Sequence, residues 1–138
     1  MKIIIDNNTT LYEIQKEFTL HFPYLKLKFF HLNNESNNKF SKTNMITDSS
    51  ITLMGIGNVY YSGHININEK QKVISLENYL KKKFGINAQV FRKYGNTWLE
   101  TITTNGLTLA EQNKEGAEMS KFLKEELVTA YDLYYEQI

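Results

Sequence analysis

The sequence predicts an α+β domain: a two-layer ferredoxin-like (βαββαβ) sandwich with an added hairpin strand and a long C-terminal helix. Two observations support this prediction. Segments in which apolar and polar residues alternate are typical of half-buried strands, and they are separated by segments with an apolar residue every three or four positions, which is typical of helices. The first six elements have the order of the split βαβ arrangement. We expect residues 1–138 to form one domain, because no linker or repeat divides them.

The first half of the chain predicts a strand, a helix and two further strands. The three isoleucines after Lys2 are expected to form the first strand. Thr10 and Glu13 are spaced as a capping box, in which each side chain binds a free backbone N–H at the start of a helix. Pro23 ends this helix, because proline lacks an N–H and disfavours helical geometry in the residue before it.

Two further strands and a loop follow. Residues 24–32 and 59–68 alternate between apolar and polar side chains, which indicates strands with one buried face each. Between them, residues 33–50 are rich in asparagine, serine and lysine, and they are expected to form a long, flexible loop. Residues 51–57 are apolar but contain two glycines, and we assign no structure to them.

The second half predicts a helix and then a hairpin. Ser75 is the expected N-cap of the helix, and Gly85 stands where a left-handed residue commonly ends one. Residues 88–103 contain two strands joined at Tyr94-Gly95-Asn96, which is a hairpin signal.

The C-terminal helix is the longest predicted element. Thr108 and Glu111 form a second capping box that begins a helix over residues 108–138, far longer than the average of about 11–12 residues. Gly116 costs a helix interior roughly 1 kcal/mol relative to alanine. It therefore either breaks the helix or permits close approach to another backbone. The apolar side is expected to include Phe122, Leu123 and Leu127. The helix is longer than a domain of this size needs to cover a sheet. Its C-terminal end is therefore a candidate partner interface, because tyrosine is enriched at interfaces. This interface consists of Tyr131, Tyr134, Tyr135 and Ile138.

Composition narrows the possible classes of function. The chain has 41% hydrophobic residues, no cysteine and a net charge of +1. The lack of cysteine excludes disulfides, thiolate zinc sites and thiol catalysis, and the low net charge argues against duplex DNA binding. Residues 108–138 contain three lysines against seven acidic residues, whereas the rest of the chain is basic. This distribution is typical of a solvated acidic helix on a weakly basic body.

The sequence contains no motif for catalysis, nucleotide binding or metal binding. Gly55-Ile56-Gly57 lacks the remainder of a phosphate-binding loop, and His21, His31 and His64 are too widely spaced to predict a metal site. We therefore expect no catalytic residue, no cofactor and no metal. No segment is long enough to span a membrane, and the N-terminal apolar run is too short for a signal peptide, so we expect a cytoplasmic protein with no membrane partner.

The hairpin contains the candidate ligand-binding residues. Arg92 is the chain's one arginine, and its planar guanidinium suits a carboxylate or phosphate. With a three-residue loop, Arg92 lies across from Trp98 and is a diagonal neighbour of Glu100 on the same face. These three residues would bind an anion or a peptide. The alternative is a cross-strand salt bridge and a cation–π contact without a ligand. A two-residue loop would change the pairing.

A third hypothesis concerns the outer face of the second and third strands. Lys26, Lys28, Phe30, Tyr60 and His64 are expected there, and basic and aromatic side chains on an open sheet can stack single-stranded bases. The favoured alternative places this face under the C-terminal helix, so that the aromatic side chains belong to the core. The RNA-recognition consensus is absent, and an acidic helix would repel phosphate.

These observations lead to three functional hypotheses. The first is a non-enzymatic protein-interaction or assembly module that binds a protein partner or self-associates. The second is a small anionic-ligand-binding protein or enzyme with its site in the hairpin at residues 88–103. The third is a single-stranded nucleic-acid-binding protein, and nucleic acid is the least expected partner.

Overall fold

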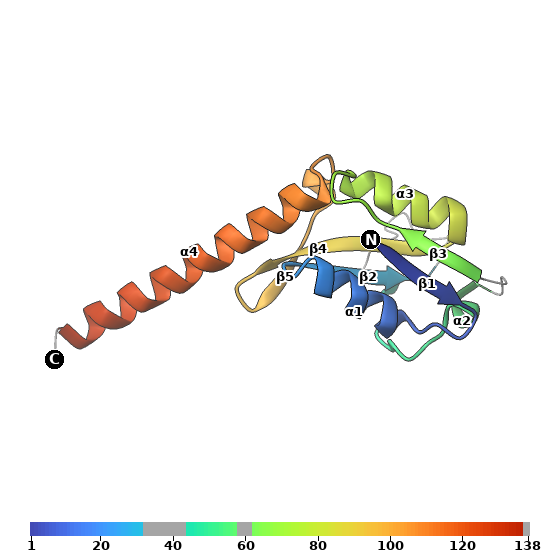
Figure 1. Ribbon diagram of the computed structural model, residues 1–138. Helices are drawn as coiled ribbons and strands as arrows, with labels where there is room; N and C mark the ends of the chain where they lie inside the picture. The colour runs from blue at the N-terminus through green and yellow to red at the C-terminus, as the bar shows by residue number, and fades with distance from the viewer. Residues whose placement is uncertain (32–43, 58–61, 137–138) are drawn as a thin grey trace.

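The structure is a computed structural model that describes residues 1–31, 44–57 and 62–136. It is a mixed α+β fold with a long C-terminal helix, as the sequence predicts (Figure 1). Its elements are, in chain order, β1 (Lys2–Asp6), α1 (Leu11–His21), β2 (Leu25–Phe30), α2 (Leu53–Gly57), β3 (Ser62–Asn66), α3 (Val73–Phe84), β4 (Asn87–Tyr94), β5 (Thr97–Glu100), a 3₁₀ helix (Ile102–Thr104) and α4 (Leu109–Glu136).

The strands form two antiparallel sheets. One sheet pairs β1 with β3, and the other has the order β2-β4-β5. In a ferredoxin-like domain the four strands share one sheet, and the second strand pairs with the third. Here β2 pairs instead with β4, the strand that follows α3. The specific ferredoxin-like topology is therefore not confirmed in the described part of the chain.

Helices α1 and α3 bury their apolar faces in one core with the inner faces of both sheets. In Figure 1, α3 lies above the strands and α1 below them. Each large side chain that becomes fully buried contributes roughly 1.5–3 kcal/mol of stabilisation. The largest fully buried side chains are Phe18, Phe29, Phe30, Leu11, Ile14, Leu25, Leu27, Leu53, Ile65, Leu76, Leu80 and Ile86.

Most of the predicted helix ends are confirmed. The Thr10 hydroxyl accepts a hydrogen bond from the Glu13 N–H at 3.2 Å, and α1 ends before Pro23. Gly85 ends α3 with φ of 64°. The prediction for Ser75 is wrong, because α3 begins at Val73. Two N–H groups of its first turn, which have no partner within the helix, donate to the backbone carbonyl groups of residues 105 and 107. This helix therefore needs no side-chain cap.

The edges of the β2-β4-β5 sheet are covered by side chains of the two helices and of the chain after β5. Gln15 and Thr19 of α1 donate to backbone carbonyl oxygens of β2, each at 2.9 Å. On the opposite edge, the Val90 N–H donates to the Glu77 carboxylate at 3.0 Å, and the Thr101 hydroxyl donates to the Val90 carbonyl oxygen at 2.7 Å. These bonds satisfy backbone groups that would otherwise form an open edge, which is a template for aggregation.

Residues 44–46, at the end of the predicted loop over 33–50, pair with β2. The Ile46 N–H donates to the Phe29 carbonyl oxygen at 2.8 Å, and Met45 forms an isolated β-bridge with Phe30. Ile46 is buried, which explains why this apolar residue interrupts a polar segment. Residues 47–50 of the predicted loop form coil and a turn. Residues 33–43 lie outside the described residues, as does Tyr60.

Helix α4 is continuous and begins with the predicted capping box. The Glu111 N–H donates to the Thr108 hydroxyl at 3.1 Å, and the Thr108 N–H donates to the Glu111 carboxylate at 3.3 Å. The helix does not break at Gly116. A Cβ atom there would lie 2.8 Å from the Cβ atom of Tyr24, so this glycine permits the expected close approach. With 28 residues, α4 is about 42 Å long.

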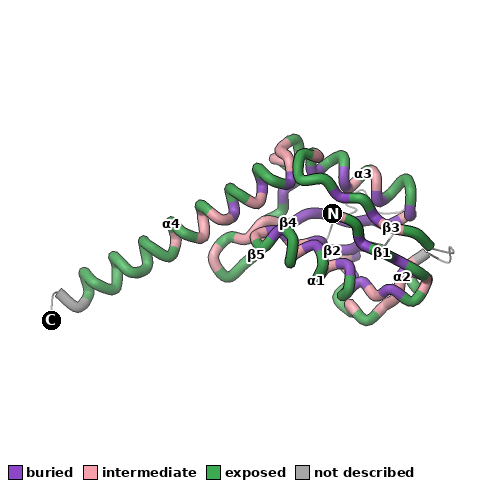
Figure 2. Tube along the Cα trace, viewed as in Figure 1, coloured by how far each residue is buried: buried purple, intermediate pink, exposed green. Residues whose placement is uncertain are grey.

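The second half of α4 leaves the rest of the protein. Every residue from 124 to 134 is exposed, and we call these residues the projecting segment (Figure 2). Only the first half of α4 therefore packs against the rest of the protein. The helix does not cover a sheet along its whole length.

Candidate functional site

The hairpin has a different register from the one the candidate ligand site requires. Its loop contains two residues, Gly95 and Asn96, with φ of 60° at the glycine. Arg92 consequently pairs with Leu99, and Phe91 pairs with Glu100. A shift of one residue moves a side chain to the other face of a sheet. The prediction that Arg92, Trp98 and Glu100 share one face is therefore wrong.

Arg92 instead connects the hairpin to α4. Its Nη1 atom donates to Oε1 of Gln112 at 3.0 Å. The Gln112 amide nitrogen in turn donates to the carbonyl oxygen and the hydroxyl of Thr104, at 2.7 and 2.9 Å. Gln112 is completely buried. This network fixes the first half of α4 against the face of the hairpin opposite to Trp98, so Arg92 has a structural position rather than a place in the candidate ligand site.

Trp98 and Glu100 share their face of the sheet with residues of β2 and β4. We call this surface the outer face. Lys26 pairs with Phe91, and Phe91 pairs with Glu100, so the ring of Phe91 lies between a row of lysines and a carboxylate. The Lys28 ammonium lies 4.2 Å from the centre of the Phe91 ring, and the Lys26 ammonium lies 5.8 Å from the centre of the Trp98 ring. The structure thus brings together two predicted ligand residues and the two lysines of the nucleic-acid hypothesis.

Two cavities meet the outer face at Trp98. One has a volume of about 310 Å³ and is lined by Lys28, Phe30, Met45, Phe91, Asn96, Thr97, Trp98 and Glu100. The other, of about 450 Å³, lies between α1 and the sheet and includes Tyr12, Lys16, Lys26 and Trp98. Small-molecule sites typically have volumes of roughly 300–1,000 Å³. Both cavities are therefore large enough for a small ligand.

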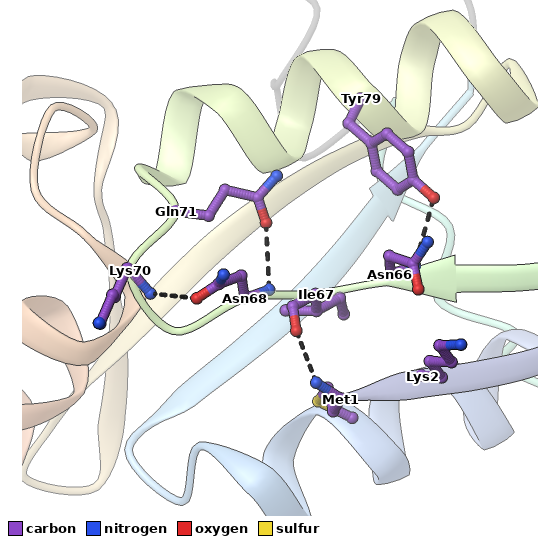
Figure 3. Close-up of a pocket in the computed structure, with 8 residues that line it drawn as sticks. All are labelled: Met1, Lys2, Asn66, Ile67, Asn68, Lys70, Gln71 and Tyr79. Atoms are coloured by element: carbon purple, nitrogen blue, oxygen red, sulfur yellow. Dashed lines mark hydrogen bonds between the residues drawn. The ribbon is translucent and has the colours of Figure 1, made fainter.

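A larger cavity, of about 680 Å³, lies where β1 begins and β3 ends (Figure 3). Its polar groups bind one another. The terminal amine of Met1 donates to the Ile67 carbonyl oxygen at 2.7 Å, and the Asn66 N–H donates to the Tyr79 hydroxyl at 3.2 Å. Its lining residues include two lysines but no carboxylate and no histidine. Among its described lining residues, this cavity therefore lacks the imidazole and carboxylate groups that most often bind a metal or act as a general acid or base.

Helix α3 places a titratable group with a strongly shifted pKa, Glu77, beside the edge of β4. Burial raises the pKa of Glu77 to about 7, and this effect outweighs the opposing one of the hydrogen bond from Val90. A cavity of about 210 Å³ beside it is lined by Glu77, Asn87 and Gln89, among others. The Asn87 amide nitrogen and both polar side-chain atoms of Gln89 are buried without a hydrogen-bond partner. Glu77 is the one carboxylate among the described residues that line this cavity.

The candidate partner interface is exposed where the structure describes its side chains. Tyr131 is 60% exposed and Tyr134 is 64% exposed. Tyr135 belongs to α4, and Ile138 lies outside the described residues. At 100° per residue, Leu123, Leu127, Tyr131 and Tyr134 form one stripe. Phe122 lies roughly 140° from Leu127 around the helix axis, so its predicted place on that side is wrong.

The described residues contain neither a candidate metal-binding cluster nor a candidate membrane-spanning helix. In residues 1–31, 44–57 and 62–136, no three His, Asp or Glu side chains gather in a way that could hold a metal ion. Over the same ranges, no helix has the length and apolar character needed to cross a membrane. No protein-family model matches the chain, and no curated protein or solved structure is significantly similar to it.

Proposed function

We propose that this protein is a non-enzymatic assembly module that associates with a second copy of itself through the projecting segment of α4. The exposure of apolar side chains supports this function. Leu127 is 71% exposed and Val128 is 53% exposed, and the two tyrosines of the stripe lie beside them. Contiguous apolar patches on soluble proteins commonly mark interaction sites. Burying one leucine of this kind contributes roughly 1.5–3 kcal/mol.

The stripe on α4 continues from the body into the projecting segment. Gly116 packs against Tyr24, and the Leu123 side chain lies 3.7 Å from the position of a Cβ atom at Gly95. Steps of four, four and three residues lead from Leu123 to Leu127, Tyr131 and Tyr134, which matches the period of a helix. The side of α4 that packs on the hairpin thus continues beyond it as an apolar stripe. Such a surface is suited to packing against another protein surface.

Charges on either side of Val128, next to the stripe, favour an antiparallel pair of helices. Lys124 and Asp132 lie near opposite ends of the projecting segment and within about 80° of each other around the helix axis. In an antiparallel pair with its two-fold axis near Val128, Lys124 of one copy meets Asp132 of the other. A parallel pair would place like charges together. Because each exposed ion pair contributes only roughly 0.2–1 kcal/mol, these charges select the orientation more than they set the affinity.

A charge exchange tests both the partner and the orientation. Lys124→Asp and Asp132→Lys should each weaken self-association about tenfold, because each change replaces two symmetry-related attractions by repulsions. The double variant should regain most of the wild-type affinity. Glu115→Lys is the matched control, because it changes the charge as Asp132→Lys does but lies at an exposed position in the first half of α4, outside the projecting segment. Sedimentation equilibrium measures all four. Failure of the double variant to recover would contradict the antiparallel pair.

A further inference from the structure

We propose that the outer face also binds a small planar aromatic anion, with its ring against Trp98 and Phe91 and its negative group at Lys28. This site is separate from the projecting segment, and it does not depend on self-association. It replaces the arginine-centred site that the hairpin sequence suggests. Three features of the outer face support it: the charge balance, the aromatic surface and the spacing of Lys28 from Glu100.

Charge on the outer face favours an anion. Lys26 and Lys28 of β2 and Lys93 of β4 contribute positive charge to this face, and Glu100 is the one carboxylate among the described residues of its strands. All three lysines are half-buried, which strengthens their electrostatic interactions relative to fully solvated lysines. A small anion that enters the cavity of about 310 Å³ reaches Lys28 directly, because Lys28 is part of the lining.

Aromatic side chains supply a surface for a planar ring. Phe91 is buried to 6% exposure and forms the floor at the centre of the outer face, whereas Trp98 is half-buried and borders two cavities. Stacking of one planar ring on an aromatic side chain contributes roughly 1–3 kcal/mol. The lysine ammonium groups over both rings already show that these faces attract positive charge. A bound ring that carries an anion can contact the rings and the ammonium groups together.

The position of Glu100 narrows the class of ligand further. Lys28 is on β2 and Glu100 is on β5, with Phe91 of β4 between the two strands. Two strand spacings, together with an offset of two residues along the strands, separate their Cα atoms by roughly 12 Å. A ligand that crosses the ring of Phe91 would therefore place its anionic group at Lys28 and a hydrogen-bond donor at Glu100. An aromatic amine that bears a carboxylate or a phosphate has both groups.

Trp98 is the chain's one tryptophan and borders both cavities, so its fluorescence reports a ligand in either of them. Substitution of Lys28 distinguishes the two, because Lys28 lines the smaller cavity and not the other. The probes are AMP and 4-aminobenzoate, compared with benzoate, which lacks the donor, adenosine, which lacks the anion, and inorganic phosphate, which lacks the ring. We expect saturable changes in fluorescence with AMP or 4-aminobenzoate at millimolar concentration or below. Lys28→Gln should weaken this binding at least tenfold. The matched control Lys82→Gln, on an exposed position of α3, should leave it unchanged.

The remaining variants separate the roles of the other groups. Glu100→Gln should remove the preference for 4-aminobenzoate over benzoate, and Trp98→Phe, measured by calorimetry, should weaken every aromatic probe. Circular dichroism confirms that each variant is folded. The proposal is overturned if neither AMP nor 4-aminobenzoate gives a saturable change, or if Lys28→Gln binds as the wild type does. It is also overturned if an oligothymidylate binds far more tightly than AMP with a steep dependence on salt, because that result identifies a single-strand nucleic-acid face.

Discussion

Gly116 of α4 lies directly against Tyr24 at the start of β2. A Cβ atom at position 116 would be 2.8 Å from the Tyr24 Cβ atom and 3.2 Å from the Tyr24 carbonyl oxygen. The N–H of the same Tyr24 donates to the side chain of Asn113 at 2.9 Å. These contacts determine where α4 crosses the hairpin sheet and hence the direction in which the projecting segment leaves the body.

Gly116→Ala should lower the free energy of unfolding by about 1 kcal/mol. Overpacking typically costs roughly 1–3 kcal/mol, and the better helix propensity of alanine recovers roughly 1 kcal/mol of that cost. Gly106→Ala is the control, because a Cβ atom there meets nothing within 4 Å. Denaturant unfolding of the two variants measures the difference. A Gly116→Ala protein as stable as the wild type would show that the close contact does not position α4.

Glu77→Gln should change the dependence of stability on pH. The pKa of Glu77 is about 7 in the folded protein, against 4.5 for an unperturbed glutamate. Between these values the folded protein holds a proton that the unfolded chain releases, so the free energy of unfolding falls as the pH rises and levels off above pH 7. In the variant, the side-chain amide oxygen at position 77 can still accept the hydrogen bond from the Val90 N–H. The variant should therefore lose this slope and exceed the wild type above pH 7 by no more than about 3 kcal/mol.

Urea unfolding at several pH values from 4 to 8 measures this effect. Glu17→Gln is the matched control, because Glu17 is an exposed glutamate of α1. It should retain the wild-type slope. If the stability of Glu77→Gln varies with pH as the wild type does, burial of Glu77 is not the source of the slope.

Two buried glutamines should respond in opposite ways to the same substitution. Gln89 is 1% exposed, and neither polar atom of its side chain has a hydrogen-bond partner. Gln112 is equally buried but binds Arg92 and Thr104. Gln89→Met should therefore raise the free energy of unfolding, and Gln112→Met should lower it, each by about 1–3 kcal/mol. Thermal or denaturant unfolding measures the two free energies of unfolding. Equal effects of both substitutions would show that the hydrogen bonds of Gln112 do not stabilise the fold.

The helices were accessible from the sequence because their signals are local. The capping box at Thr108 and the left-handed Gly85 depend on neighbouring residues alone, and both appear in the structure as predicted. Of the box at Thr10, the structure shows the hydrogen bond from the Glu13 N–H to the Thr10 hydroxyl. Ser75 failed as an N-cap because its helix obtains hydrogen bonds from a distant segment, residues 105–107. Strand pairing is likewise a long-range property, which is why β2 could not be assigned to β4 from the pattern alone.

The candidate site was predictable only in part for a similar reason. Trp98 and Glu100 were recognised as a pair, but the length of one turn decides which side chains accompany them. With a two-residue loop at Gly95, Phe91 replaces Arg92 on their face. Glu77 gave no sequence signal, because its raised pKa arises from the packing of α3 beside β4. The exposure of Leu127 also depends on where the body ends, which the period of the helix does not reveal.

The mass of the wild-type protein in solution, measured by light scattering over a wide range of concentrations, tests the central claim most directly. The account predicts a transition from 16.2 kDa to twice that mass as the concentration rises. Leu127→Lys should remain monomeric, with unchanged circular dichroism, because it places a charge in the centre of the stripe. A wild-type protein that stays at the monomer mass at every concentration would contradict self-association through the projecting segment.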